Sequence, residues 1–256
     1  MIECMWKSAM KEAALVHIPD NFLDTKTWAT AAVVSTAAIG GAVRSIRHKS
    51  EEEMARAIPM MGAMGAFVFA AMMINFPVPG GTSGHLVGAA LLAITLGLAP
   101  SIVVLSVVVI LQALLFQDGG LVVMGANVFN MAVIAPLAGA GVYYTLRRVF
   151  PRHGSWAELA SAWFSVMAAA AAAAVELAVS GTVPWIVVLP AMLGWHALIG
   201  VGEAAITLSA LRLINRAGIL PQANGTAPTG AGKRVEALAM VPAGLPADRE
   251  EVDRIA

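Results

Sequence analysis

Two histidines stand close to apolar segments that are long enough to enter a membrane. His17 belongs to VHIPDNFLD, residues 16–24, directly ahead of the first long apolar run, and His85 lies in the glycine-rich stretch PVPGGTSGHLVG, residues 77–88. Imidazole suits nickel, cobalt, copper and zinc, whereas magnesium and calcium prefer oxygen. For either histidine alone the simpler interpretation is structural, as an interfacial side chain or as part of a tight turn. Together, on one side of a membrane, they favour a transition-metal site.

Several polar side chains near these histidines could orient a metal-bound imidazole through hydrogen bonds. The stretch LLFQDGGLVVMGANVFNMAV, residues 114–133, places amides and an acid at the end of one apolar run and within the next. Hydrogen bonding between helices explains such residues equally well, because polar side chains in a membrane helix usually face the bundle interior. The candidates for this supporting role are Asp20, Ser83, Gln117, Asn127 and Asn130.

Three further ionisable residues stand within apolar runs: Glu176 in AAAAVELAV, and His196 and Glu203 in GWHALIGVGEAAIT. An acid at the middle of a membrane costs about 2.5–3.5 kcal/mol on insertion scales, so such a residue is usually paired, protonated or functional. A proton relay is one interpretation. A structural contact between a glutamate and a histidine or the backbone is simpler, and we prefer it.

The composition is that of a polytopic membrane protein. Of the 256 residues, 59% are hydrophobic and 12% are charged, whereas a soluble domain carries about 25% charged residues. The mean hydropathy is +0.77. The net charge of zero gives no field that would attract nucleic acid, and the single Cys4 excludes a disulfide framework or a cysteine metal cluster within one chain.

Seven apolar segments are candidates for membrane-spanning helices, which need roughly 20 residues each. We expect the short third segment to be tilted or partly re-entrant. Lys and Arg cluster in the loops after the first, fifth and seventh segments, which makes those loops cytoplasmic by the positive-inside rule. The sequence therefore predicts an all-α membrane protein, a bundle of about seven transmembrane helices with its N-terminus outside and its C-terminus cytoplasmic, and places both histidines on the outer side. The segments are 27–44, 56–76, 86–99, 101–117, 122–146, 157–179 and 185–212.

Two other patterns bear on partners. Small residues recur at four-residue spacing in the first segment, at Ala32, Thr36 and Gly40, where they could serve internal packing or docking to another membrane subunit. In the tail, GTAPTGAGKR differs from a phosphate-binding loop because Arg234 follows Lys233 where Ser or Thr is required. We expect no nucleotide site on this chain, so energy from ATP would come from a partner.

Four stretches in series, HIPDNFLD, GGTSGHLVG, LQALLFQDGGLVVMGANVFNMAV and HALIGVGEAAIT, resemble the CbiM/NikM family. These are the substrate-specific S components of energy-coupling-factor (ECF) transporters for cobalt and nickel. The resemblance covers roughly residues 17–216. It implies a multi-pass protein of the bacterial plasma membrane that captures Ni²⁺ or Co²⁺ outside. Its partners would be a transmembrane T component, two ABC ATPase subunits and, in many systems, a small N-type accessory membrane subunit.

The resemblance also implies a ligand set of four nitrogens in a plane. Three belong to the N-terminus: the amino group, the second residue's backbone amide and its imidazole. Here that residue is His17, and His85 supplies the fourth nitrogen. Such a set suits d⁸ nickel and also binds copper or cobalt. The sequence does not decide between nickel and cobalt, although HIPD resembles the nickel proteins slightly more.

The family pattern requires a free amine directly before His17, yet His17 is the seventeenth residue. We therefore expect translation to start at Val16, because a GTG codon reads as valine internally but initiates as Met; proteolytic trimming to a terminus beside His17 is the alternative route. Residues 1–15 would then be an extension ahead of the true start, 16–216 the transmembrane metal-binding domain, and 217–256 a flexible cytoplasmic tail rich in Gly, Pro and Ala.

Two other functions are alternatives. An intramembrane metalloenzyme would use the histidines and glutamates, but the sequence has no HExxH motif, so we expect no enzyme activity. A self-sufficient proton-coupled cation transporter would use Glu176 and Glu203 and would work without ATPase partners.

The predicted start gives a first test. We expect the protein purified from membranes to begin with Met at position 16 followed by His17, as measured by intact mass and N-terminal sequencing. A mature chain that retains Met1 or Ile2 would contradict the predicted start.

Overall fold

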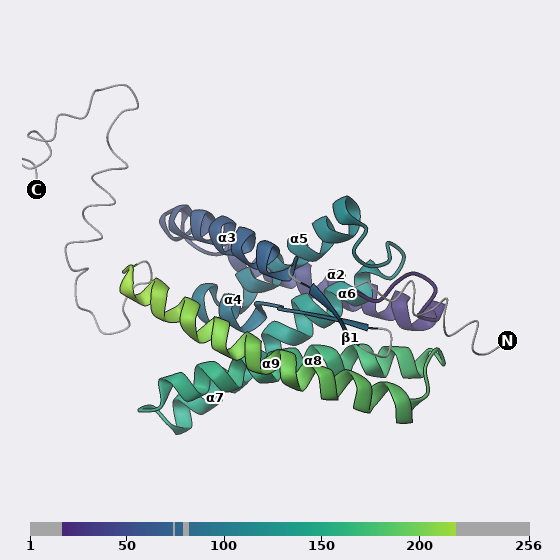
Figure 1. Ribbon diagram of the computed structural model, residues 1–256. Helices are drawn as coiled ribbons and strands as arrows, with labels where there is room; N and C mark the ends of the chain where they lie inside the picture. Colours follow the sequence, from purple (N-terminus) through teal and green to yellow (C-terminus); the bar gives the residue numbers. More distant parts are fainter. Residues whose placement is uncertain (1–16, 74, 79–81, 219–256) are drawn as a thin grey trace, which may run out of the picture. The chain divides into compact units, whose positions relative to one another are not determined.

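The computed structural model describes residues 17–73, 75–78 and 82–218; Val16, the predicted extension 1–15 and most of the predicted tail lie outside them. The chain divides into two compact units, residues 1–208 and 209–256. Of the second, the structure describes the last turns of α9 and a turn at 217–218. Figure 1 shows the helices and strands in a ribbon diagram. In chain order they are α2 Thr25–Arg47, α3 Glu51–Met72, β1 Asn75–Val78, β2 Thr82–His85, α4 Ala89–Leu96, α5 Leu98–Phe116, α6 Met124–Val128, η1 Phe129–Ile134, α7 Ala135–Val149, α8 Gly154–Val179 and α9 Trp185–Arg216.

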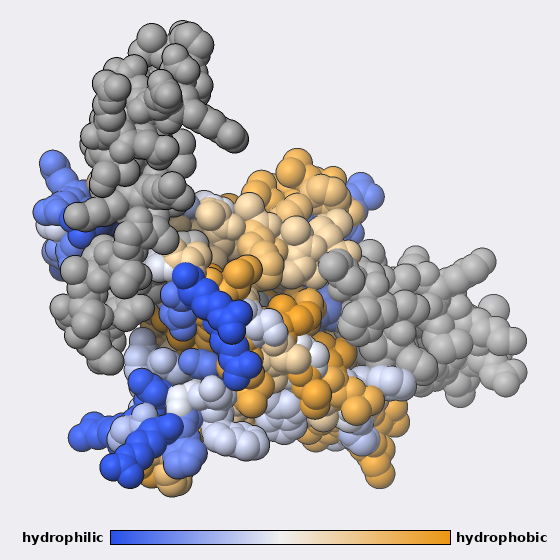
Figure 2. Space-filling model, turned by 60° about the vertical axis from the view of Figure 1, so that its left-hand side comes forward, coloured by the Kyte–Doolittle hydropathy of each residue, from blue (hydrophilic) through white to orange (hydrophobic). Residues whose placement is uncertain are grey.

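Six helical stretches among the described residues are long and apolar enough to cross a membrane: α2, α3, α5, the run from α6 to α7, α8 and α9. Large apolar side chains on these helices face outward, among them Val33, Leu115 and Leu198. Figure 2 shows apolar residues over much of one face, with the hydrophilic residues gathered mainly to one side. Exposed apolar surface of this extent is what a lipid-facing bundle presents, so the prediction of a helical membrane protein is confirmed.

The third predicted segment, 86–99, is not a long helix. An antiparallel hairpin of β1 and β2, in which Asn75 pairs with His85, precedes it, and the segment itself holds only the eight-residue α4 and the start of α5. Eight residues rise about 12 Å, far less than the ~30 Å of a bilayer core. Among the described residues, six helical stretches are therefore long enough to span a membrane, and the short α4 takes the place of the third of the seven predicted segments. Gly88 and Gly97 stand at the two ends of α4. Their φ values of 68° and 86° lie outside the right-handed helical region and favour glycine, so the helix ends at both residues.

The short α4 is nevertheless required by the path of the chain. Helices α3 and α5 run parallel, because their C-terminal ends meet: the Phe69 and Phe116 rings lie 5.6 Å apart, and the Gln112 amide lies 4.0 Å from the Met73 sulfur. The chain must therefore turn back between them, and α4 makes the return. Its residues Ala89–Ala93 are completely buried, which agrees with the expectation of a partly re-entrant segment.

The run from α6 to α7 is continuous but contains the π-helical turn η1, Phe129–Ile134. Pro136 is the second residue after this turn. Proline has no N–H and its ring displaces the carbonyl four residues earlier, so a wider turn before it is expected. Helix α8 is fixed against α7 by hydroxyls, since Ser165 donates to the Ala135 carbonyl and Ser161 to the Gly139 carbonyl.

Residues 17–24 form an irregular segment that leads into α2. Asp24 ends it as an N-cap, accepting from the backbone N–H groups of Lys26 and Thr27 and from the Thr27 hydroxyl. These hydrogen bonds lower the pKa of Asp24, because they favour the charged carboxylate. The Thr182 hydroxyl donates to the Phe22 carbonyl, so the segment is also fixed to the loop after α8.

Candidate metal site

His17 is positioned through its neighbour Ile18, whose backbone is held by one side chain. The side-chain oxygen of Asn127 accepts from the Ile18 N–H at 2.9 Å, and the side-chain nitrogen of Asn127 donates to the Ile18 carbonyl at 3.0 Å. The same carbonyl accepts from the Gly120 N–H at 3.0 Å. Asn127 thus satisfies both polar backbone groups of a buried, non-helical residue, as a strand partner would.

Asp20 makes a second set of bonds to the loop before α6. Its carboxylate accepts from the N–H groups of Leu121, Val122 and Val123 at 3.1, 2.8 and 3.3 Å. Three backbone donors converging on one carboxylate form strong, charge-assisted contacts. Asp20 and Asn127 therefore fix the segment that carries His17, and neither side chain is in a hydrogen bond with the imidazole itself.

The loop before α6 passes very close to His17. A Cβ placed on Gly119 would lie 2.5 Å from the His17 Cβ and 3.0 Å from the Asn127 amide nitrogen. Gly119 also has a φ of 98°, a conformation that other residues adopt only with strain. Glycine is required here by both space and backbone geometry.

His85 ends β2 and is almost completely buried. Its Nδ1 lies 2.6 Å from the Leu86 carbonyl oxygen. Because a carbonyl only accepts, Nδ1 carries the proton and Nε2 presents a lone pair, the form that binds a metal ion. Burial, followed by the proximity of His17, lowers the pKa of His85 to about 3, so the ring is neutral at physiological pH.

The structure brings the two histidines together. Their ring centroids lie 5.6 Å apart and their planes are inclined by 24°. Two metal–nitrogen bonds of about 2.0–2.1 Å each span about 4 Å, so the separation of the rings is on the scale that a shared ion would require. His17 is 4% and His85 6% exposed, so the structure brings together, in a buried position, two residues that the sequence analysis expected on the same side of a membrane.

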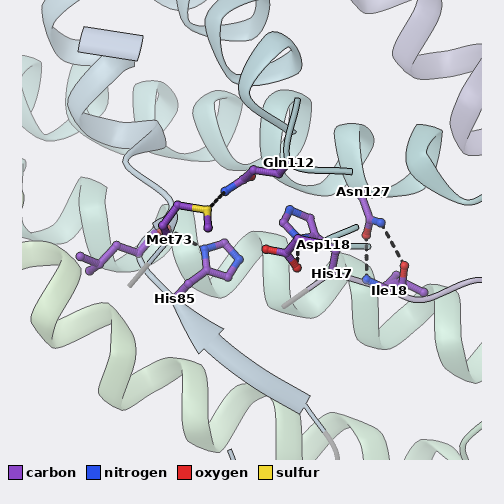
Figure 3. Close-up of polar contacts among 8 residues, drawn as sticks. His17, Ile18, Met73, His85, Gln112, Asp118 and Asn127 are labelled. Atoms are coloured by element: carbon purple, nitrogen blue, oxygen red, sulfur yellow. Dashed lines mark hydrogen bonds and ion pairs between the residues drawn. The ribbon is translucent and has the colours of Figure 1, made fainter. Parts of the chain in front are cut away.

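Asp118 and Gln112 also lie at this pair (Figure 3). One Asp118 carboxylate oxygen is 3.0 Å from Nδ1 of His17. Gln112 is fully buried, and its side-chain oxygen has no hydrogen-bond partner among the described residues. Asp118 is the acid of the stretch 114–133 that the sequence analysis noted but did not include among its five supporting candidates, and Gln112 was not selected. A glutamine within the apolar run SIVVLSVVVILQALLF was a usable signal, as was an acid directly after that run.

Other predicted supporting residues lie elsewhere. Gln117 is exposed at the end of α5 in a left-handed conformation, and its neighbour Asp118 faces His17 instead. Asn130 donates to the buried Glu176 at 2.7 Å, so it joins two helices. Ser83 pairs with Pro77 in the hairpin, where only the backbone is described.

The ionisable residues of the apolar runs make local contacts. Glu203 accepts from the N–H groups of Val87 and Gly88, and Nδ1 of His196 lies 2.7 Å from the Met192 carbonyl oxygen. The glutamate–backbone contact that we preferred on sequence grounds is present at Glu203.

The small residues of α2 divide between two environments. Ala32 packs against Gly125 of α6, where an added Cβ on the glycine would lie 2.5 Å from the Cβ of Ala32. Thr36 and Gly40 are exposed. Internal packing therefore accounts for Ala32 alone of the three.

Within the described part of the chain, no three His, Cys, Asp or Glu side chains form a metal-binding cluster. A site here would consequently need backbone or terminal nitrogens beside the two imidazoles.

The apolar helices and the buried histidine pair define a multi-pass membrane protein with an enclosed polar site. The model of the family described as the cobalt uptake substrate-specific transmembrane region, CbiM, matches residues 17–219. The chain belongs to this family.

Curated relatives carry related descriptions. A putative fused nickel transport protein NikMN of Archaeoglobus fulgidus is 35% identical over 201 residues, which are 78% of this chain and 65% of that protein. A putative metal transport protein of Haloquadratum walsbyi is 37% identical over 75% of this chain and 86% of its own length. A crystal structure described as a transition metal transporter matches with a TM-score of 0.72 and 32% identity, covering 78% of this chain and 92% of that chain.

The close approach at Gly119 yields a prediction. Gly119→Ala adds a methyl group against His17 at a positive φ, so we expect it to destabilise the fold by roughly 2–4 kcal/mol and to displace His17. Thermal unfolding in detergent, followed by circular dichroism, measures the effect.

Gly181→Ala is the matched control, because Gly181 also has a positive φ, 71°, but has no atom within 4 Å of the added Cβ. We expect it to cost about 1 kcal/mol. Equal losses of stability in the two variants would contradict the importance of the contact with His17.

Proposed function

We propose that the chain is the substrate-capture subunit of an ECF-type uptake transporter for nickel or cobalt. The observation that carries the proposal is the stacked pair of His17 and His85, which come from segments 68 positions apart and are both buried. Membership of the CbiM family and the likeness to a transition metal transporter support the same function.

The ligands we propose are the imidazoles of His17 and His85, the backbone amide nitrogen of His17 and the amino group of residue 16. If the amide and imidazole of His17 bind one ion, the smaller and favoured chelate ring is closed by Nδ1. Asp118 faces that nitrogen at 3.0 Å. Metal binding would thus replace this contact by a metal–nitrogen bond and leave the carboxylate close to the bound cation.

Four nitrogen ligands in a plane favour Ni²⁺ and Cu²⁺ over metals that require oxygen or tetrahedral coordination. The amine and the amide must lose protons before they bind, so binding releases protons and weakens as the pH falls. His85 adds little to this dependence, because its pKa of about 3 keeps it neutral.

The proposed ligand set predicts the effect of removing His85. We expect His85→Ala to weaken Ni²⁺ binding by roughly 100-fold or more, since the loss of a direct ligand exceeds the 10–100-fold typical of outer-shell changes. Isothermal titration of Ni²⁺ into detergent-purified protein that starts at residue 16 measures this.

His48→Ala is the control, because His48 is an exposed histidine at the far end of α2. It should leave the affinity within twofold. Unchanged affinity in His85→Ala would remove His85 from the site.

We further propose that a T component and two ABC ATPase subunits assemble with this chain, joined in many systems of this kind by a small N-type accessory subunit. Thr36 and Gly40 leave a small, exposed surface on α2, where another membrane helix could approach closely. Glu176 and Glu203 each bind a neighbouring group, which supports structural roles for them rather than a proton path.

An uptake assay separates the two transport mechanisms. We expect ⁶³Ni²⁺ to accumulate in cells only when the chain is produced with its ATPase partners, and an inactive ATPase to abolish uptake. Uptake by this chain alone that stops when the proton gradient is dissipated would favour the proton-coupled alternative.

A further inference from the structure

Glu203 of α9 makes an unusual contact with the segment between β2 and α4. Its two carboxyl oxygens accept separately from successive backbone N–H groups, one from Val87 at 2.9 Å and one from Gly88 at 2.6 Å. Glu203 is 2% exposed and Val87 is 4% exposed. The contact joins positions more than 110 residues apart.

These two N–H groups have no partner in a helix or in the hairpin, because they lie between β2 and α4. Buried backbone donors need partners, and in a membrane protein an unsatisfied one costs several kcal/mol. Nothing in residues 86–88 itself can supply an acceptor side chain, since their sequence is Leu-Val-Gly. The side chain of Glu203 meets this need from another helix.

The segment that Glu203 holds leads directly to His85. Val87 is two residues after His85, and the Leu86 carbonyl between them lies 2.6 Å from Nδ1 of the imidazole. Gly88 packs closely on Val68 of α3, whose Cγ2 would lie 2.6 Å from an added Cβ. The position of residues 86–88 thus determines where the His85 ring stands and which nitrogen it presents.

We propose that Glu203 is a positioning residue of the metal site: by holding the Val87 and Gly88 N–H groups, it fixes His85 at the distance from His17 that a shared metal ion requires. The inference rests on the proposed function, in which His85 is a ligand. Glu203 touches neither the ion nor the imidazole, and it acts through the backbone of residues 86–88.

Glu203→Gln tests the inference with little change of shape. The amide offers one acceptor oxygen and turns an NH₂ group toward the second backbone donor, so one hydrogen bond is lost and two donors face each other. We expect Ni²⁺ affinity to fall by roughly 10–100-fold, the range for changes outside the ligand shell. At saturating Ni²⁺, the visible absorption spectrum should shift in the direction seen for His85→Ala, because the fourth nitrogen is displaced.

A double-mutant cycle shows whether the effect passes through His85. In the His85→Ala background we expect Glu203→Gln to change affinity by less than about twofold. Thr207→Val is the matched control, a similarly shaped change at a residue equally buried one turn further along α9, and it should leave affinity and spectrum unchanged in either background.

The outcomes separate the inference from the proposed function. If His85→Ala leaves Ni²⁺ affinity unchanged, the proposed ligand set fails. If His85→Ala weakens binding but Glu203→Gln does not, or weakens it equally with and without His85, the positioning role alone is overturned. Should Glu203→Gln not fold, Glu203→Asp is measured in the same way, because it keeps the carboxyl group but shortens its reach by one methylene.

Discussion

Non-helical backbone buried among membrane helices must find hydrogen-bond partners within the protein, and the site depends on this requirement. Three irregular stretches converge at it: residues 17–24, the segment 86–88, and the loop 117–123 before α6. Water does not satisfy buried polar groups in a bilayer core, where each backbone N–H or C=O group without a hydrogen-bond partner costs several kcal/mol. Asn127, Asp20 and Glu203 supply the missing partners, so the side chains that make the irregular backbone possible also determine where the histidines stand.

Most of the fold could be predicted from the sequence because long apolar runs leave few alternatives. Five of the long helices and the run from α6 to α7 were expected near their observed positions. The region 74–97 was not predictable in the same way. Its hydropathy is that of a short helix, but the hairpin is set by the pairing of Asn75 with His85, and the length of α4 by glycines at positive φ. Hydropathy does not encode either feature.

The candidate site was predictable in its residue types but only partly in its contacts. His17, His85, Asp20 and Asn127 all lie where polar residues interrupt apolar sequence. The sequence does not show which of the adjacent residues Gln117 and Asp118 faces the histidines. Gln117 takes a left-handed backbone conformation at the end of α5, and Asp118 rather than Gln117 lies against His17. Gln112 was missed because it stands alone in an apolar helix, where its partners come from other segments.

The two imidazoles are held by different hydrogen bonds, although Ile18, next to His17, also packs in one core cluster with Val188 and Met192 of α9. His17 is fixed through α6 and the loop before it, by Asn127 and Asp20. His85 is fixed through α9, by Glu203 acting on residues 87 and 88. Loss of the Glu203 contacts would therefore release residues 87 and 88 and leave intact the hydrogen bonds that hold Ile18 and Asp20. Because two imidazoles can share one ion only while both reach it, a shift of His85 alone would be enough to weaken the proposed site.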